Sequence, residues 1–159
     1  HLSLRRQRQM CIRDRSHSPL DLIIIMLGTN DLKKRFNRSS DEVAKGVKEL
    51  INIAKHTFSG KGTWHDQNLS EIVVICPPVL GELSNDLQWS NYIEWEGAFD
   101  KSKKLFNSIK HVTDEEKIYL IDSNQYIKSS NLDPIHWSKK THETFGKKVA
   151  DLIVNRIKL

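Results

Sequence analysis

The sequence has 159 residues, 38% of them hydrophobic and 28% charged, which suits one domain with a substantial core. The formal net charge is +5, but residues 1–17 hold five arginines and one aspartate, a net +4 that leaves +1 for the rest. This balance argues against a nucleic-acid-binding domain. No apolar run is long enough to span a membrane.

Residues 1–18 form a basic segment whose few apolar residues are too scattered to build a buried helix or strand face. We expect this segment to be a flexible arm, or to be foreign to the domain. The domain itself is expected over residues 19–159. If the arginines of the segment bound nucleic acid, that binding would depend steeply on salt.

The domain opens with a continuous apolar run over residues 22–27, which contains three adjacent isoleucines. Such a run predicts a strand over about residues 20–27, buried on both faces as in parallel sheets covered by helices. The cluster Gly28-Thr29-Asn30-Asp31 follows at the carboxyl end of the strand, where open α/β sheets bind ligands. Gly28 permits backbone conformations that side chains forbid, and the Asn30 amide can point into a crevice.

Two further strands and three helices follow from the pattern of apolar residues and breakers. In chain order they are a helix from Ser39 to about residue 58, a strand over 72–76, a helix over about 96–112, a strand over 118–121 and a helix that begins after Ser138. Ser39 and Glu42 match a capping box at the first helix start. Three repeats of strand and helix predict right-handed crossovers and a parallel sheet.

The remaining segments give weaker indications. The long loop over 79–96 carries Trp89, Tyr92 and Trp95, which we expect to line a pocket. The basic loop over 33–35 could attract an anionic substrate, although a solvated loop is the simpler interpretation. The cysteines fit neither a disulfide framework nor a metal site, and a buried free thiol is the simplest interpretation of Cys76.

Asp133 stands three residues before His136, in the segment that enters the last helix, and Pro134 stiffens the link between them. A carboxylate at this spacing can hold an imidazole in one tautomer and stabilise the imidazolium. Taken alone, the pair could be a solvated surface loop. Together with the Asn30 amide at the same sheet edge, it supplies an oxyanion donor and a base with its orienter, as acyl transfer to a hydroxyl nucleophile requires.

At residues 20–157 the chain resembles the SGNH (GDSL-type) esterases and acylhydrolases. Gly28-Thr29-Asn30-Asp31 is similar to that family's third sequence block, and Asp133-Pro134-Ile135-His136 to its fifth. The Cys-Pro-Pro at 76–78 and the Trp-Glu-Gly-Ala at 95–98 are similar to the arylesterase-like branch.

The resemblance implies a three-layer α/β/α flavodoxin-like domain whose first strands are missing. In the flavodoxin-like order the strand over 20–27 would lie beside the missing first strand, so its backbone edge would be unpaired and its apolar faces only partly covered. It implies hydrolysis of carboxylic esters of small to medium acyl groups, with no metal or organic cofactor. His136 would be the general base and then acid, Asp133 its orienter and Asn30 an oxyanion donor. Gly28 and Thr29 would contribute to substrate binding. Trp137 could line the substrate pocket or pack under the last helix.

The family's Gly-Asp-Ser block, which carries the nucleophile, has no match in the sequence, and neither does its second block. Both belong upstream of Leu20, and Ser3, Ser16 and Ser18 lack the flanking pattern. Ser16 and Ser18 also precede a strand of eight residues, which puts them roughly 26 Å from Asn30 at about 3.3 Å per residue. We therefore expect this chain by itself to be inactive.

An alternative from another class is a catalytically inactive α/β domain that binds a carbohydrate or acyl ligand. A Gly-Asp-Ser block upstream of Leu20 would distinguish an enzyme from such a binding domain. The sequence leaves open the acyl and alcohol specificity, the oligomeric state and the compartment, which would be the cytoplasm if no signal peptide lies upstream.

Overall fold

The computed structural model describes residues 20–57, 69–130 and 132–156. Its strands are β1 (Leu22–Ile25), β2 (Glu71–Cys76) and β3 (Tyr119–Asp122). Its helices are α2 (Ser40–Lys55), α3 (Tyr92–Trp95), α4 (Ala98–Glu116) and α5 (Lys139–Arg156). Short 3-10 turns are η1 (Asn30–Leu32), η2 (Lys34–Phe36), η3 (Glu82–Asn85) and η4 (Ser123–Gln125).

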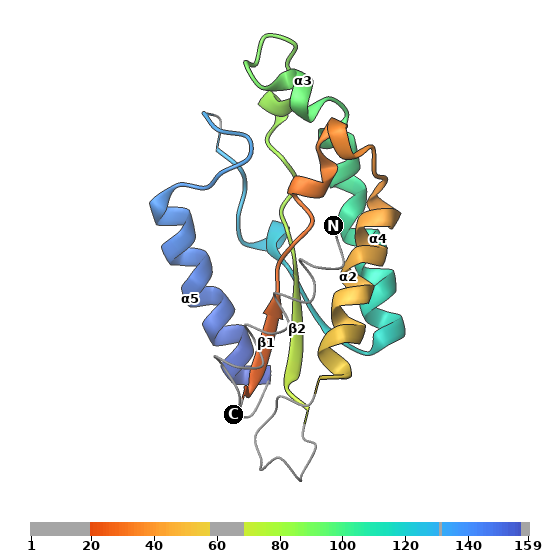
Figure 1. Ribbon diagram of the computed structural model, residues 1–159. Helices are drawn as coiled ribbons and strands as arrows, with labels where there is room; N and C mark the ends of the chain where they lie inside the picture. The colour runs from red at the N-terminus through yellow and green to blue at the C-terminus, as the bar shows by residue number, and fades with distance from the viewer. Residues whose placement is uncertain (1–19, 58–68, 131, 157–159) are drawn as a thin grey trace.

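The strands form one parallel sheet in the order β1-β2-β3. Leu22 pairs with Glu71, and Val73 pairs with Tyr119. Helices α2 and α4 lie on one face of the sheet and α5 lies on the other (Figure 1). The predicted three-layer α/β/α architecture is confirmed.

Each face of the sheet has its own hydrophobic core. Toward α2 and α4, Ile51, Leu105 and Ile109 are fully buried. Toward α5, Val73 and Ile75 of β2 join a smaller cluster that includes Phe145. The central strand β2 is therefore buried on both faces, as its continuous apolar run predicts.

The first strand is shorter than predicted and is only partly buried. β1 has four residues rather than eight, and Ile24 and Leu27 are 46% and 55% exposed. Burial on both faces, predicted from the apolar run, is wrong, whereas the partly covered faces expected beside a missing strand are confirmed. The physical reason is the place of β1 in the sheet. Among the described residues it pairs with β2 alone, so its other edge and part of its surface lack a covering neighbour.

The capping box at the start of α2 is confirmed. The Glu42 N–H donates to Ser39 Oγ at 3.2 Å, and the Ser39 N–H donates back to Glu42 Oε2 at 2.8 Å. The helix ends at Lys55, earlier than predicted. Helix α4 runs to Glu116, a full turn beyond the prediction, and ends where Lys117 adopts a left-handed conformation with φ of 56°.

The aromatic loop between β2 and α4 corrects a further expectation. Trp95 is 5% exposed and belongs to the core beneath α2 and α4, so it is not a pocket wall. Trp89 packs against the same core. The neighbouring basic loop is not simply solvated either. Lys33 Nζ lies 3.0 Å from Glu94 Oε1 and 4.9 Å from the ring centre of Trp95.

The expectations for residues 1–18 and for the loop that holds Trp64 and His65 fall on residues outside the described ranges.

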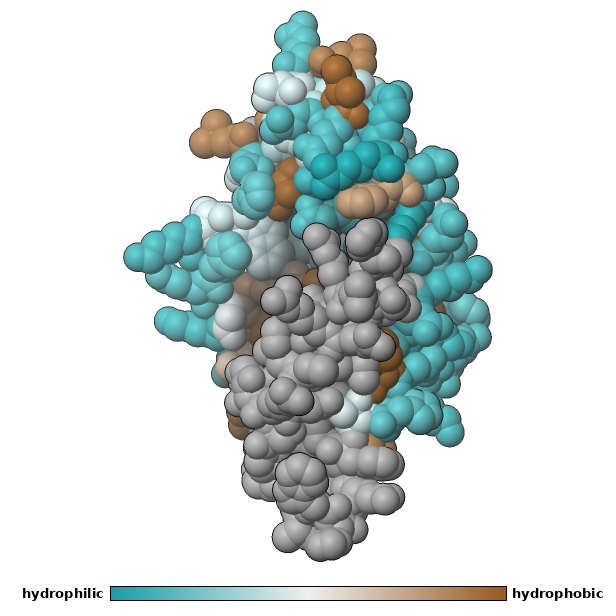
Figure 2. All heavy atoms as spheres, viewed as in Figure 1, coloured by the Kyte–Doolittle hydropathy of each residue, from teal (hydrophilic) through white to brown (hydrophobic). Residues whose placement is uncertain are grey.

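Across the ranges that are described, no helix is both long enough and apolar enough to cross a membrane. In the view of Figure 2, the surface over α2 and α4 is mostly hydrophilic, while hydrophobic side chains gather near α3.

Candidate active site

The turn that ends β1 requires glycine for two independent reasons. Gly28 is buried and has φ of +123°, which side chains rarely allow. A Cβ at this position would lie 3.0 Å from Val43 Cγ1 on α2 and 3.7 Å from Leu105 Cδ2 on α4. Gly28 therefore lets the chain leave the sheet close against two helices.

Asn30 begins η1 directly after this turn. The turn is closed by the Asp31 N–H, which donates to the Gly28 carbonyl at 3.1 Å, and it is anchored by Leu32, which is 1% exposed. Asn30 itself is exposed, and its side chain has no hydrogen-bond partner in the described part of the chain. The amide is thus held on a fixed turn and is free to donate to a ligand. Thr29, before it, is partly buried.

Asp133 and His136 form the hydrogen-bonded pair that their spacing predicts. His136 Nδ1 lies 2.8 Å from Asp133 Oδ2, while Asp133 Oδ1 accepts the N–H groups of Ile135 and His136 at 2.9 Å each. A proton on Nδ1 satisfies this contact and leaves the Nε2 lone pair directed away from the carboxylate. The His136 side chain is 80% exposed, so Nε2 can reach a substrate.

Two opposing effects act on the pKa of the Asp133 carboxyl. Partial burial raises the pKa, but the hydrogen bonds from the His136 and Ile135 N–H groups and from the His136 ring outweigh burial. The net pKa is below its ordinary value. Asp133 therefore stays ionised at neutral pH, where it can stabilise an imidazolium on His136.

Two residues that the sequence analysis did not single out hold this loop in place. Ser130 Oγ accepts the Asp133 N–H at 2.8 Å and donates to the Asp133 carbonyl at 3.0 Å. The Gly81 N–H, from the segment after β2, donates to the carbonyl of the fully buried Pro134 at 2.9 Å. A serine three residues before an aspartate is a local turn signal that could have identified Ser130. Gly81 has no such signal, because its partner is distant in sequence.

The residues after His136 attach the loop to α5. The partly buried Trp137 packs edge-on against Phe145, with ring centres 5.6 Å apart, and lies 5.0 Å from the ring of His142. Ser138 Oγ accepts the Thr141 N–H at 3.2 Å, which supports Ser138 as the helix cap. Trp137 thus packs against the last helix, and its part in substrate binding stays a prediction.

Asn30 follows β1, and the loop with Asp133 and His136 follows β3, so both lie beyond the carboxyl ends of the parallel strands (Figure 1). This is the sheet edge at which ligands bind in open α/β folds. No hydroxyl group of the described residues is hydrogen-bonded to His136 Nε2. The described residues thus place the Asp133–His136 pair and the Asn30 amide at one edge of the sheet.

Cys76 is poorly suited to act as a nucleophile. It is fully buried at the end of β2, and burial, followed by the negative charge of Asp122, raises the pKa of its thiol to about 12. The thiolate is therefore scarce at neutral pH. In the part of the chain that the structure describes, no three His, Cys, Asp or Glu side chains are grouped closely enough to hold a metal ion.

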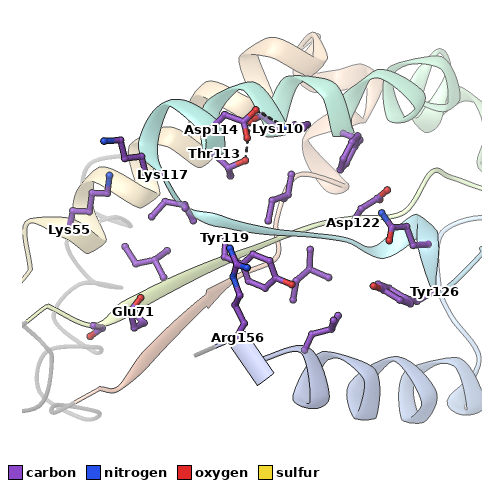
Figure 3. Close-up of a pocket in the computed structure, with 18 of the residues that line it drawn as sticks. Lys55, Glu71, Lys110, Thr113, Asp114, Lys117, Tyr119, Asp122, Tyr126 and Arg156 are labelled. Carbon is purple, nitrogen blue, oxygen red and sulfur yellow. Dashed lines mark hydrogen bonds and ion pairs between the residues drawn. The ribbon is translucent and has the colours of Figure 1, made fainter. Parts of the chain in front are cut away.

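Two hollows lie away from His136. One, of about 710 Å³, is lined by residues that follow β2 and β3, including Leu80, Asn124 and Ser130. The other, of about 1260 Å³, runs along the outer edge of β3 between α4 and α5 (Figure 3). In this groove Lys110 is paired with Asp114. Neither hollow includes Asp133 or His136 among its lining residues.

The comparisons with known proteins identify a family for the chain. Residues 4–149 match the model of the GDSL-like lipase/acylhydrolase family. No curated protein matches the chain in sequence.

Solved structures of esterases superpose on most of the chain. The inhibitor-bound aryl esterase of M. smegmatis is 27% identical, with a TM-score of 0.80, and the match covers 94% of this chain and 66% of that one. A carbohydrate acetylesterase from Sinorhizobium meliloti is 32% identical, with a TM-score of 0.78, over 92% of this chain and 65% of that one. The chain thus spans slightly less than two thirds of the length of these proteins.

Proposed function

The chain belongs to the GDSL-like lipase/acylhydrolase family, and from this membership we propose that the whole protein hydrolyses carboxylic esters of small to medium acyl groups by a serine mechanism. The observation that carries the proposal is the Asp133–His136 contact of 2.8 Å, in a loop at the same sheet edge as the Asn30 amide, which has no hydrogen-bond partner among the described residues. The aryl esterase and carbohydrate acetylesterase neighbours support it.

In the proposed reaction, His136 Nε2 takes the proton of a serine hydroxyl as the serine oxygen attacks the ester carbonyl carbon. Asp133 stabilises the imidazolium, and the Asn30 amide donates to the oxyanion. His136 then gives the proton to the departing alcohol oxygen, which leaves an acyl-serine. Water, activated by the same imidazole, attacks the acyl carbon and releases the carboxylic acid and the serine.

We assign the nucleophile to a Gly-Asp-Ser block that precedes Leu20 in the whole protein. The chain by itself would then hold a base and one oxyanion donor without a nucleophile. Systems that have lost a triad member retain at most about 10³–10⁴-fold acceleration over water. The chain would fall below that range, because other oxyanion donors of the family belong to the same missing blocks.

The names of the neighbours suggest two substrate classes to compare. One is aryl esters, and the other is acetylated carbohydrates. The two classes differ in the leaving alcohol, which is a phenol in the first and a sugar hydroxyl in the second. The whole enzyme could hydrolyse both classes with a kcat/KM that depends mainly on the alcohol. The part of the site that contacts the alcohol would then determine substrate specificity.

The test compares this chain with a version extended upstream through a Gly-Asp-Ser block, using nitrophenyl acetate and an acetylated sugar. We expect hydrolysis by the extended chain alone, and its loss in His136→Ala. His111→Ala is the matched control, because that histidine is 77% exposed on α4 and should leave the rate unchanged. Burst kinetics with the short chain would mean that a nucleophile lies within it, and the assignment would fail.

A further inference from the structure

We propose that Gly81 is a positioning residue, whose lack of a side chain lets the segment after β2 fix the place of the Asp133–His136 pair. The inference rests on the proposed function for its catalytic meaning. Gly81 lies in the segment between β2 and η3, and it acts on the pair through Pro134.

The contact between the two segments is closer than any other residue would permit. The Gly81 N–H donates to the Pro134 carbonyl at 2.9 Å. A Cβ on Gly81 would lie 2.9 Å from Pro134 Cα, 3.0 Å from Pro134 Cβ and 3.3 Å from Ser129 Cβ. Real Cβ atoms essentially never approach another atom more closely than 3.0 Å, so something must move.

Space, and not backbone conformation, is what requires glycine here. Gly81 has φ of −66° and ψ of 150°, values that any residue adopts. Alanine could therefore take the same backbone angles without strain. What alanine cannot do is keep the same distance from the Pro134 backbone, which is not the movable end of a flexible side chain.

A displacement of Pro134 would be passed on to both members of the pair. Pro134 is fully buried and directly follows Asp133, and its ring restricts the backbone. Asp133 Oδ1 accepts the N–H groups of Ile135 and His136, so the carboxylate, the backbone and the imidazole form one hydrogen-bonded unit. A shift at Pro134 therefore moves the unit or breaks its hydrogen bonds.

The size of the shift is large enough to affect catalysis. Ordinary contact begins at 3.4 Å, so a Cβ at 2.9 Å from Pro134 Cα requires a movement of about 0.5 Å. Catalytic groups have to be held to within roughly 0.5 Å, and a misplacement of about 1 Å can lower the rate about 100-fold. Gly81→Ala should thus lower kcat by about 10- to 100-fold.

A second contact joins the same two segments without involving Gly81. Ser129 Oγ donates to the Val79 carbonyl at 3.0 Å. Ser129→Ala removes this hydrogen bond while adding no atom, so it loosens the attachment without a steric clash. It therefore provides an independent variant if Gly81→Ala does not fold.

The first measurement needs no ester hydrolysis, and it uses this chain as it stands. The Asp133 carboxyl is titrated by carbon NMR in the parent, in Gly81→Ala and in Gly146→Ala. Gly146 lies on α5, with no atom within 4 Å of a Cβ built there, and serves as the matched control. We expect the lowered pKa of Asp133 to rise toward its ordinary value in Gly81→Ala alone, because the hydrogen bonds that lower it are disturbed.

The second measurement uses the extended, active chain. We expect Gly81→Ala to lower kcat with little change in KM, because the pair acts in the transition state, and Gly146→Ala to match the parent. A folded Gly81→Ala variant with the parent's Asp133 titration and kcat would overturn the proposal. If Gly81→Ala does not fold, an unchanged Asp133 titration in Ser129→Ala would overturn it.

The two proposals fail in different ways. If Gly81→Ala shifts the Asp133 titration but the extended chain hydrolyses no ester, the positioning of the pair stands and the proposed function falls. If the extended chain is active and the titration and kcat of Gly81→Ala equal those of the parent, the esterase proposal stands and the role of Gly81 falls.

Discussion

Replacement of Gly28 by alanine should destabilise the fold more than any ordinary glycine-to-alanine change. A non-glycine residue in such a sparsely populated backbone region costs about 1–3 kcal/mol. The new Cβ would also lie 3.0 Å from Cγ1 of the buried Val43, and overpacking of this kind costs about 1–3 kcal/mol. The sum, about 2–6 kcal/mol, is a large part of the 5–15 kcal/mol typical of a whole domain.

The assay is urea unfolding followed by circular dichroism, with Gly46→Ala as the matched control. Gly46 lies inside α2 with nothing within 4 Å of a built Cβ, so alanine there should raise the free energy of unfolding by about 0.5–1 kcal/mol. Gly28→Ala should instead shift the midpoint strongly downward at an unchanged slope. A Gly28→Ala midpoint equal to that of the parent would refute the packing and backbone argument.

Three further expectations follow from the same structure. Ser39→Ala should lower the free energy of unfolding by about 1 kcal/mol through loss of the capping box, and a loss near zero in urea unfolding would contradict it. Cys76, with its thiol pKa raised to about 12, should react with a thiol reagent at pH 8 only after unfolding, and rapid native reaction would count against its burial. Because the folded-state pKa of Asp133 is lowered, its ionised form contributes stability above its ordinary pKa, and this contribution is lost as the pH falls through the lowered value. Asp133→Asn should therefore be less stable than the parent at pH 7, with the difference closing in acid.

The features predicted correctly from the sequence are those whose interacting residues lie close together in the chain. The capping box of Ser39 and Glu42 and the Asp133–His136 contact each involve residues three apart, and both were predicted correctly. The continuous apolar run of β2 likewise predicted a strand buried on both faces. In these cases the spacing alone brings the side chains or faces together.

The misses have a common physical cause, which is contact between distant segments. Trp95 became a core residue because α3 contacts the distant turn η2, and Lys33 found its partner Glu94 61 residues away. Ile24 is exposed because the burial of a strand depends on its neighbours in the sheet. The need for glycine at position 81 is also invisible locally, since it arises from the backbone of Pro134.

The most direct test of the Asp133–His136 pair as the acid–base part of a serine esterase is covalent labelling with a fluorophosphonate, read by peptide mass spectrometry. The chain extended through a Gly-Asp-Ser block should gain one label on the serine of that block. His136→Ala should abolish the labelling, and the chain as it stands should gain no label. Labelling of a serine within residues 20–156, or labelling that persists in His136→Ala, would contradict the assignment.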